Sequence, residues 1–250
     1  MVRSASVPVV CITGGARRLG RVIAQDLAQV GYRVAITYWH SALEAQKTVS
    51  DLRAQGVDAE AFALDLAHPE AIPPAARAIL DRFGRLDALV NNAGVHSPAA
   101  LDSISPSQWD EAFALHARAP MLLTQALLPE LRQRGGRVVH LGSLGATSAW
   151  PQYAHYCASK AALESLTRTM ARAFAPDLSV NCVAPGWIQM EDSPSDRQED
   201  PSVAARFAAR TPMQRNGLAT EVAAAVRFFL TGPHFITGQI LTVDGGLGLV

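Results

Sequence analysis

The chain has few cysteines, few lysines, few aromatic residues and no excess of either charge, and these shortages exclude several classes of protein. Among its 250 residues are three cysteines, and 6% of the residues are aromatic, while the formal net charge is zero. Cys11, Cys157 and Cys182 are odd in number, widely spaced and set among apolar residues. This pattern predicts reduced thiols, and it matches neither a disulfide framework nor a zinc site. The balanced charge also lacks the basic excess of a nucleic-acid-binding protein.

Metal, membrane and secretion signals are missing as well. The seven histidines show no metal-ligand spacing, and no apolar run approaches the roughly 18 residues that would span a bilayer. The opening segment MVRSASVPVVCITGG enters a predicted strand directly, without the pattern of a signal peptide. We therefore expect a cytoplasmic protein that binds no metal, no membrane and no nucleic acid.

Short apolar runs alternate with helix-like segments along the whole chain, and nearly half of the residues are apolar. Predicted strands cover residues 7–13, 32–38, 59–65, 86–94, 136–143, 178–186 and 239–246, and predicted helices cover about 17–31, 41–56, 73–84, 107–134, 155–174 and 220–232. Ser41 with Glu44 predicts a capping box at the start of the second helix. The alternation predicts an α/β fold over residues 1–250: one Rossmann-like, doubly wound parallel sheet with helices on both faces.

One segment departs from the alternation. Residues 187–202 are polar, acidic and rich in proline and serine. We interpret residues 187–215 as a mobile substrate flap over a site, and a passive surface excursion is the alternative.

The first strand leads into a glycine-bearing turn, Thr13 to Gly20, and then into a helix. In this turn Gly14 and Gly20 would let a phosphate approach the backbone, and the helix N-terminus would supply N–H groups to it. The second strand ends without the acid that an NAD site uses to bind the ribose 2′-hydroxyl. Instead, Arg17 and Arg18 of the glycine-bearing turn can converge with residues at the end of this strand on a 2′-phosphate, which predicts NADP(H). The residues at the strand end are Tyr38, His40 and Ser41. The alternative is that the arginines are solvated turn residues.

Tyr156 and Lys160 stand four residues apart in a segment with helical periodicity, so both side chains project from one helix face. Lysine is rare in this chain, the only other one being Lys47. A nearby ammonium favours the phenolate and lowers the pKa of a tyrosine, which makes a proton donor. The alternative is a core tyrosine beside a surface lysine.

With further motifs, these residues make the chain resemble the short-chain dehydrogenase/reductase family over essentially its whole length. The matching residues are the turn from Thr13 to Gly20 with Leu19, Asp65, Asn91 to Gly94, Ser143, Tyr156 with Lys160, Pro185-Gly186, and Asp244 to Gly246. The resemblance implies that Asp65 and Leu66 contact adenine. It also implies that the turn of Asn92, Ala93 and Gly94 borders the ribose and that Pro185 to Ile188 hold the nicotinamide, with Gly186 among them.

The resemblance further implies a mechanism. Hydride passes from the nicotinamide to a carbonyl carbon, while Tyr156 gives its proton to the carbonyl oxygen. Ser143 donates a hydrogen bond to the same oxygen, where negative charge develops. Lys160 lowers the tyrosine pKa and binds the ribose hydroxyls. Without Tyr156, Ser143 would be interpreted as an ordinary loop serine.

The chain departs from the family pattern at several positions. Arg18 replaces a usual glycine, Met190 replaces a threonine that follows Pro-Gly, and His116 stands where an asparagine commonly supports a proton relay. A histidine can pass a proton, and packing between helices is the alternative. Arg18 and the end of the second strand match the pattern of the pteridine-reductase branch. Ser143 and His96 depart from that pattern, since the branch has an aspartate and an aromatic residue at these two positions.

The leading hypothesis is an NADPH-dependent reductase of a ketone or aldehyde. The alternatives are a pteridine reductase, a 3-oxoacyl thioester reductase and, from another class, a non-catalytic NADP-sensing regulator. A thioester reductase needs a basic patch for its acidic carrier protein, and the arginines here are scattered. His96, Trp150, Tyr153 and Trp187 predict an apolar, aromatic-walled substrate site without a fixed charge for an anionic substrate.

Two predicted helices carry more apolar residues than one buried stripe requires. They include Leu115, Met121, Leu122, Leu127 and Leu128 in one, and Ala158, Ala161, Ala162, Leu163, Leu166 and Met170 in the other. In the family, such helices form a four-helix interface, so we expect a homotetramer or homodimer. The alternative is packing under loops of the same chain.

Overall fold

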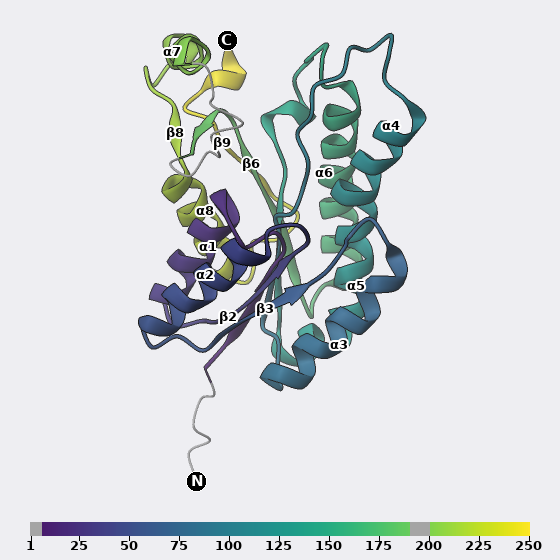
Figure 1. Cartoon of the computed structure of the whole chain (residues 1–250), viewed down its shortest axis with the longest axis vertical. Helices are drawn as coiled ribbons and strands as arrows, with labels where there is room; N and C mark the ends of the chain where they lie inside the picture. Colours follow the sequence, from purple (N-terminus) through teal and green to yellow (C-terminus); the bar gives the residue numbers. More distant parts are fainter. Residues whose placement is uncertain (1–6, 191–200) are drawn as a thin grey trace.

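A seven-stranded parallel sheet forms the centre of the molecule (Figure 1). The computed structural model describes residues 7–190 and 201–250. The strands lie in the order β3-β2-β1-β4-β5-β6-β9 and pair in parallel throughout. Their bounds are β1 (Val9–Ile12), β2 (Arg33–Tyr38), β3 (Ala59–Ala63), β4 (Ala88–Asn91), β5 (Arg137–Leu141), β6 (Ser179–Pro185) and β9 (Ile240–Val243). The predicted doubly wound α/β sheet is confirmed.

Helices cover both faces of this sheet, as Figure 1 shows. One face carries α1 (Arg18–Gln29), α2 (Ala42–Ala54) and α8 (Ala219–Thr231). The other carries α3 (Ile72–Phe83), α4 (Pro106–Phe113), α5 (Ala119–Arg134) and α6 (Ala154–Phe174). Each predicted helix therefore has a counterpart in the structure.

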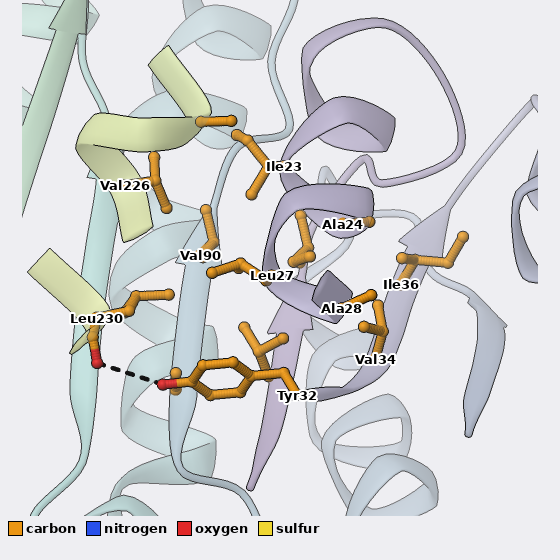
Figure 2. Close-up of a cluster of buried hydrophobic side chains, with 14 of the residues drawn as sticks. Ile23, Ala24, Leu27, Ala28, Tyr32, Val34, Ile36, Val90, Val226 and Leu230 are labelled. Atoms are coloured by element: carbon orange, nitrogen blue, oxygen red, sulfur yellow. Dashed lines mark hydrogen bonds between the residues drawn. The ribbon is translucent and has the colours of Figure 1, made fainter. Parts of the chain in front are cut away.

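The buried strands connect two hydrophobic cores, one on each side of the sheet. In β1, Val10 and Ile12 belong to the core under α1 and α8, whereas Val9 and Cys11 belong to the core under α3 and α5. This alternation follows from the two-residue period of a strand. Figure 2 shows the first core, where the Tyr32 hydroxyl donates a hydrogen bond to the Leu230 carbonyl oxygen at 3.2 Å and connects the segment between α1 and β2 to α8.

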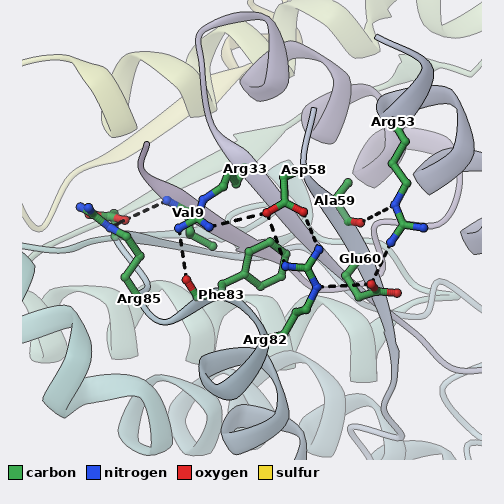
Figure 3. A network of polar contacts seen from close by, with 10 residues as sticks. Val9, Arg33, Arg53, Asp58, Ala59, Glu60, Arg82, Phe83 and Arg85 are labelled. Atoms are coloured by element: carbon green, nitrogen blue, oxygen red, sulfur yellow. Dashed lines mark hydrogen bonds and ion pairs between the residues drawn. The ribbon is translucent and has the colours of Figure 1, made fainter. Parts of the chain in front are cut away.

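Charged side chains gather at the amino ends of the strands, and Figure 3 shows most of them. Ion pairs join Arg33 and Arg82 to Asp58, Arg53 and Arg82 to Glu60, and Arg85 to Asp87. These pairs link the starts of β2, β3 and β4 to the ends of α2 and α3. These ion pairs lie at the end of the sheet opposite the carboxyl ends of the strands.

The strand order reverses between β1 and β4, because β2 and β3 lie on one side of β1 and the later strands lie on the other. Parallel sheets bind ligands beyond the carboxyl ends of the strands at such a point. The fold thus places the end of β1 and the loops after β4, β5 and β6 around one crevice.

Local structure differs from the sequence-based expectation in three places. The helix predicted over 107–134 is divided by one turn of π-helix, Ala114–Arg118, between α4 and α5. The Ser41 side chain makes no capping hydrogen bond, so the predicted capping box is wrong. Within the predicted flap, 187–215, lie β7 (Ile188–Gln189) and α7 (Pro201–Arg210), and β7 pairs with β8 (Gly217–Leu218). Residues 191–200 of the flap lie outside the described residues.

Over the described ranges, no helix is both long and apolar enough to cross a membrane. The same ranges contain no group of three or more histidine, cysteine or acidic residues placed to hold a metal ion. Cys11, Cys157 and Cys182 are free thiols, as the sequence predicts.

Candidate active site

A cavity of about 1210 Å³ lies over the carboxyl ends of β4, β5 and β6. Pockets for a single small ligand are usually about 300–1,000 Å³, so this one has room for a dinucleotide and a second molecule together. It brings together most of the predicted site residues: Arg18, Leu19, Asn92, Gly94, His96, His116, Ser143, Trp150, Tyr153, Tyr156, Lys160, Pro185, Gly186, Trp187 and Ile188.

The glycine-bearing turn is fixed against the loop that follows β4. The Thr13 hydroxyl oxygen accepts from the backbone N–H groups of Asn92 and Ala93 at 2.9 and 3.0 Å. The Asn92 amide donates to the Thr13 carbonyl oxygen at 2.8 Å. A Cβ added at Gly20 would lie 2.2 Å from the Gly14 carbonyl oxygen, so a side chain does not fit there. The start of α1 therefore packs closely against the turn, and the N-terminal N–H groups of α1 lie beside it, where a phosphate could bind.

Arg18 has a left-handed backbone, with φ of 50°, although it is not glycine. Such a conformation costs a non-glycine residue about 1–2 kcal/mol, which explains why the family's pattern has glycine at this position. The Arg18 side chain lines the cavity, whereas Arg17 is exposed and does not.

The remaining residues predicted at the adenosine end do not line this cavity: Gly14, Gly20, Tyr38, His40, Ser41, Asp65, Leu66 and Ala93. Asp65 has local partners, since one carboxylate oxygen accepts from the Ala67 N–H at 2.9 Å and the other lies 2.7 Å from the His68 ring. Leu66 is buried. Asp65 thus shapes the turn after β3, at the same edge of the sheet as the end of β2.

A second glycine motif lies beside the end of β6. A Cβ added at Gly186 would lie 2.6 Å from the Asp244 Cβ. The Asp244 carboxylate accepts from the backbone N–H groups of Gly246 and Gly248 at 2.9 and 2.8 Å. This contact explains why Pro185-Gly186 and Asp244-Gly245-Gly246, which lie far apart in the sequence, occur together.

Tyr156 and Lys160 come from α6, and Ser143 follows β5. Lys160 donates from its Nζ to the Leu141 carbonyl oxygen at 2.7 Å, and this Nζ lies 5.8 Å from the centre of the Tyr156 ring. The Ser143 hydroxyl oxygen accepts from the Gly145 N–H at 3.0 Å. These three side chains are buried or half-buried on one wall of the cavity.

Burial controls the titration of this wall. It raises the pKa of Tyr156 to about 12, against the lowering effect of the Ser143 hydroxyl. Burial also lowers the pKa of Lys160 to about 8, because the low-dielectric surroundings disfavour its charge. Burial therefore dominates the pKa of Tyr156 in this structure, and the lowering of that pKa by Lys160 stays a prediction.

His116 lies in the π-helical turn, and both of its ring nitrogens have partners. Nε2 accepts from the Val95 backbone N–H at 3.0 Å, so Nδ1 carries the proton and donates to the Ser159 hydroxyl at 2.8 Å. The Ser159 hydroxyl donates in turn to the Tyr156 carbonyl oxygen at 2.8 Å. Burial lowers the pKa of His116 to about 2, so the ring stays neutral. A side chain at Gly94 would meet this ring, with Cβ 2.7 Å from Nε2.

The aromatic residues predicted at the substrate site line the same cavity, beside Tyr156. His96 stacks on Tyr153 with centroids 4.3 Å apart, and it meets the Tyr156 ring edge-on at 4.8 Å. Trp150 lies parallel to Tyr156 at 6.3 Å. Trp187 stacks on Phe207 of α7 at 4.1 Å, which attaches α7 to the rim of the cavity.

Sequence reasoning missed the contribution of α7. Arg206 and Arg210 line the cavity, so the prediction of a site without fixed charge is wrong. With Val203 and Phe207 these residues follow the i, i+3, i+4, i+7 spacing of one helix face. This spacing is visible in the sequence, but the segment was interpreted as a polar flap.

A parallel sheet with a glycine-bearing turn at its strand-order reversal defines a dinucleotide-binding α/β protein. A family model described as Enoyl-(Acyl carrier protein) reductase matches residues 14–248. The 3-oxoacyl-[acyl-carrier-protein] reductase FabG of Staphylococcus aureus strain Mu50 is 34% identical, over 94% of this chain and 96% of that protein.

Solved structures agree with this assignment. A short-chain dehydrogenase from Burkholderia cenocepacia J2315, in complex with NADP, is 37% identical with a TM-score of 0.87, covering 96% of this chain and 97% of that chain. The acetoin dehydrogenase YohF of Salmonella typhimurium is 32% identical with a TM-score of 0.87, covering 98% of this chain and 97% of the other. The chain belongs to the short-chain dehydrogenase/reductase family of oxidoreductases.

Proposed function

We propose that this chain uses NADPH to reduce the carbonyl group of a ketone or aldehyde. The observation that carries the proposal is one cavity in which Tyr156, Ser143 and Lys160 lie on the wall next to the glycine-bearing turn. A carbonyl placed against this wall would have a hydroxyl donor for its oxygen and room beside it for a cofactor.

The residues fit a dinucleotide. Gly20 lets the first turn of α1 pack directly against the Gly14 carbonyl, and α1 presents its N-terminal N–H groups at the same turn. NADPH, when bound, would supply the hydride. Asn92, Ala93 and Gly94 would border its ribose, and Pro185 to Ile188 would hold the nicotinamide end. Asp65 and Leu66 would contact the adenine.

Three side chains would carry the chemistry of this chain. Tyr156 would transfer its hydroxyl proton to the carbonyl oxygen, and Ser143 would hold that oxygen by a hydrogen bond while it gains negative charge. Lys160 would bind a ribose hydroxyl and stay largely charged at neutral pH, since its pKa is about 8. An ammonium that leaves the Leu141 carbonyl for the ribose would then lie closer to the phenol and ease its deprotonation.

His116 would serve as a positioning residue rather than a relay. Its two nitrogens hold Val95 of the cofactor loop and, through Ser159, the backbone of Tyr156. A neutral ring with both nitrogens engaged has no free site for a travelling proton.

NADP(H) would be preferred to NAD(H). The end of β2 has no acid for a 2′-hydroxyl, and Arg17, Arg18, His40 and Ser41 would bind a 2′-phosphate. The structural relative from Burkholderia cenocepacia is in complex with NADP, which supports the same choice.

A 3-oxoacyl thioester reductase is the second candidate, favoured by the identity to the Staphylococcus aureus enzyme. The loss of NADPH absorbance should be followed with a panel of ketones, oxoacyl thioesters and dihydropteridines. Reduction of a ketone or oxoacyl thioester at a rate that depends on Tyr156 supports the proposal. No oxidation of NADPH with any panel member, or reduction of dihydropteridines alone, would contradict it.

We further propose a homotetramer or homodimer. The strand β9 is at the edge of the sheet, and exposed apolar residues lie on it and after it: Leu241, Leu249 and Val250. An exposed sheet edge with apolar residues is a surface on which a second chain can pack. Light scattering at micromolar protein should show a multiple of the 26.6 kDa monomer, and a monomer mass would contradict the proposal. The free thiols also favour a cytoplasmic location, which fractionation of the source cells would test.

A further inference from the structure

One face of α7 contributes two arginines to the lining of the active-site cavity. Val203, Arg206, Phe207 and Arg210 all line it, and they repeat at the spacing of a single helix face. The stack of Phe207 on Trp187 at 4.1 Å holds this face against the loop that follows β6. Both arginines are exposed residues of the cavity lining, four positions apart on the helix.

The charge of these arginines is not balanced within the described part of the chain. Neither Arg206 nor Arg210 forms an ion pair with a described residue, and the only contact of either guanidinium given by the structure is that of Arg206 over the Phe207 ring, at 5.8 Å. The cavity lining in the described ranges contains no aspartate or glutamate, while it does contain Arg18 and Lys160. The arginines at the amino ends of the strands, by contrast, are paired with carboxylates.

Arg206 and Arg210 come from a different part of the chain from the cofactor residues. Arg18 belongs to the turn after β1, whereas α7 lies between β6 and α8 and follows Trp187, one of the predicted substrate residues. The aromatic wall of His96, Trp150 and Tyr153 would surround the reacting part of a substrate. Arg206 and Arg210, which line the same cavity, would then contact the part of the substrate that lies away from its reacting carbonyl.

We propose that Arg206 and Arg210 bind an oxyanion of the substrate, a carboxylate or a phosphate, remote from the reacting carbonyl. This proposal rests on the proposed carbonyl reduction and names the substrate class for the same site. Guanidinium groups bind carboxylate and phosphate through paired N–H donors, and an arginine at a cavity mouth also raises the local concentration of anions. Neutral ketones would therefore be poor substrates compared with anionic ones that have the same carbonyl.

The test compares substrates that share a reacting group and differ in charge. One pair is acetoacetyl-coenzyme A and the neutral acetoacetyl N-acetylcysteamine thioester, which lacks the phosphates. The other pair is a medium-chain oxo acid, with its carboxylate remote from the ketone, and its methyl ester. We expect kcat/KM to be at least ~10-fold higher for the anionic member of one pair, and the pair that responds identifies phosphate or carboxylate.

The variant for this test is Arg206→Gln/Arg210→Gln, which removes both charges and keeps long polar side chains. It should lower kcat/KM by about 10-fold or more for the anionic member and by less than about 2-fold for the neutral member. The matched control is Arg77→Gln/Arg172→Gln, because both of these arginines are exposed and neither lines the cavity. The control variant should have the same kcat/KM as the wild type for both the anionic and the neutral substrate. The preference for the anion should also fall with added salt in the wild type alone.

Equal kcat/KM values within both pairs, or equal losses on charged and neutral members in the double variant, would overturn the proposal. A binding measurement separates this outcome from failure of the proposed reduction. With NADP⁺ saturating, free coenzyme A and the oxo acid should each be titrated against the wild type and the double variant. Arginine-dependent binding without any turnover would reject the reduction and keep the anion site. Turnover of ketones without arginine-dependent binding would support the reduction and reject the anion site.

Discussion

The two ends of the central sheet differ in whether their charged side chains have charged partners. At the amino ends of the strands, Arg33, Arg82 and Arg85 are paired with Asp58 or Asp87. At the carboxyl ends, the Lys160 amine is buried against a carbonyl oxygen, and Arg206 lines a cavity whose described lining has no aspartate or glutamate.

This difference separates stability from ligand binding. A paired charge at the amino end stabilises the folded chain modestly, and its binding partner is already part of the protein. An uncompensated cation in a cavity lowers stability or contributes nothing until an anion or a ribose binds beside it. Substitutions at the two ends should accordingly change different measurements.

The largest effect is expected at the cavity end, from Tyr156→Phe. The ring and its packing against His96 and Trp150 remain, but the proton donor is lost. Turnover should fall by at least ~10²-fold, with cofactor affinity and thermal stability nearly unchanged. A variant that keeps more than about a tenth of the wild-type rate at saturating cofactor would show that Tyr156 is not the proton donor.

Cofactor choice should change next most strongly. In the wild type, NADPH should bind more tightly than NADH. Arg17→Ala or Arg18→Ala should reduce the difference between the two dissociation constants. Loss of a charged contact to phosphate is worth roughly 1–3 kcal/mol, or about 5- to 150-fold in dissociation constant. Fluorescence titration with both cofactors measures this directly. Equal dissociation constants in the wild type would rule out the preference for NADP(H).

At the amino end, Asp87→Asn should alter stability and leave activity unchanged. The Asp87 carboxylate accepts from the Val9 N–H at 2.8 Å and pairs with Arg85, and its side chain is 15% exposed. We expect a loss of about 1–2 kcal/mol in the free energy of unfolding, measured with urea. The control, Glu44→Gln, changes an exposed acid on α2 and should change neither quantity. A fall in kcat for Asp87→Asn without a fall in stability would break the comparison.

The last effect is a change in how stability depends on pH, and it appears only under acid conditions. The folded pKa of His116 is lowered to about 2 from 6.5, so the neutral ring stabilises the fold above pH 6.5, and this stability is lost as the pH falls below it. One such group contributes about 1.4 kcal/mol per pH unit. His116→Asn should reduce the acid slope of unfolding by roughly that amount, while His140, with its pKa lowered to about 3, keeps its share.

The His116 experiment also separates positioning from relay. Asparagine can accept from the Val95 N–H and donate to the Ser159 hydroxyl, so His116→Asn should keep most of the activity, with the same pH profile of kcat. His116→Ala should raise KM for the cofactor, because the loop of Val95 loses its anchor. A change in the pH profile of kcat in His116→Asn would favour a relay.

The sequence predicted the elements that depend on local periodicity. The seven strands and the Tyr156 helix were correct because apolar runs and helical spacing are properties of neighbouring residues. The π-helical turn at Ala114–Arg118 was missed, since a single inserted residue leaves the apolar pattern of the long helix almost unchanged. The Ser41 capping box was wrong because the pattern gives the residues but not the rotamer.

By itself, the sequence determined the parallel sheet, the glycine-bearing turn at its reversal point and the family to which the chain belongs. Only the tertiary structure decided that burial raises the pKa of Tyr156, that His116 has a neutral ring with both nitrogens engaged, and that Arg206 and Arg210 line the cavity. The reason is physical: desolvation, hydrogen-bond partners and the direction of a side chain depend on segments that meet only after folding.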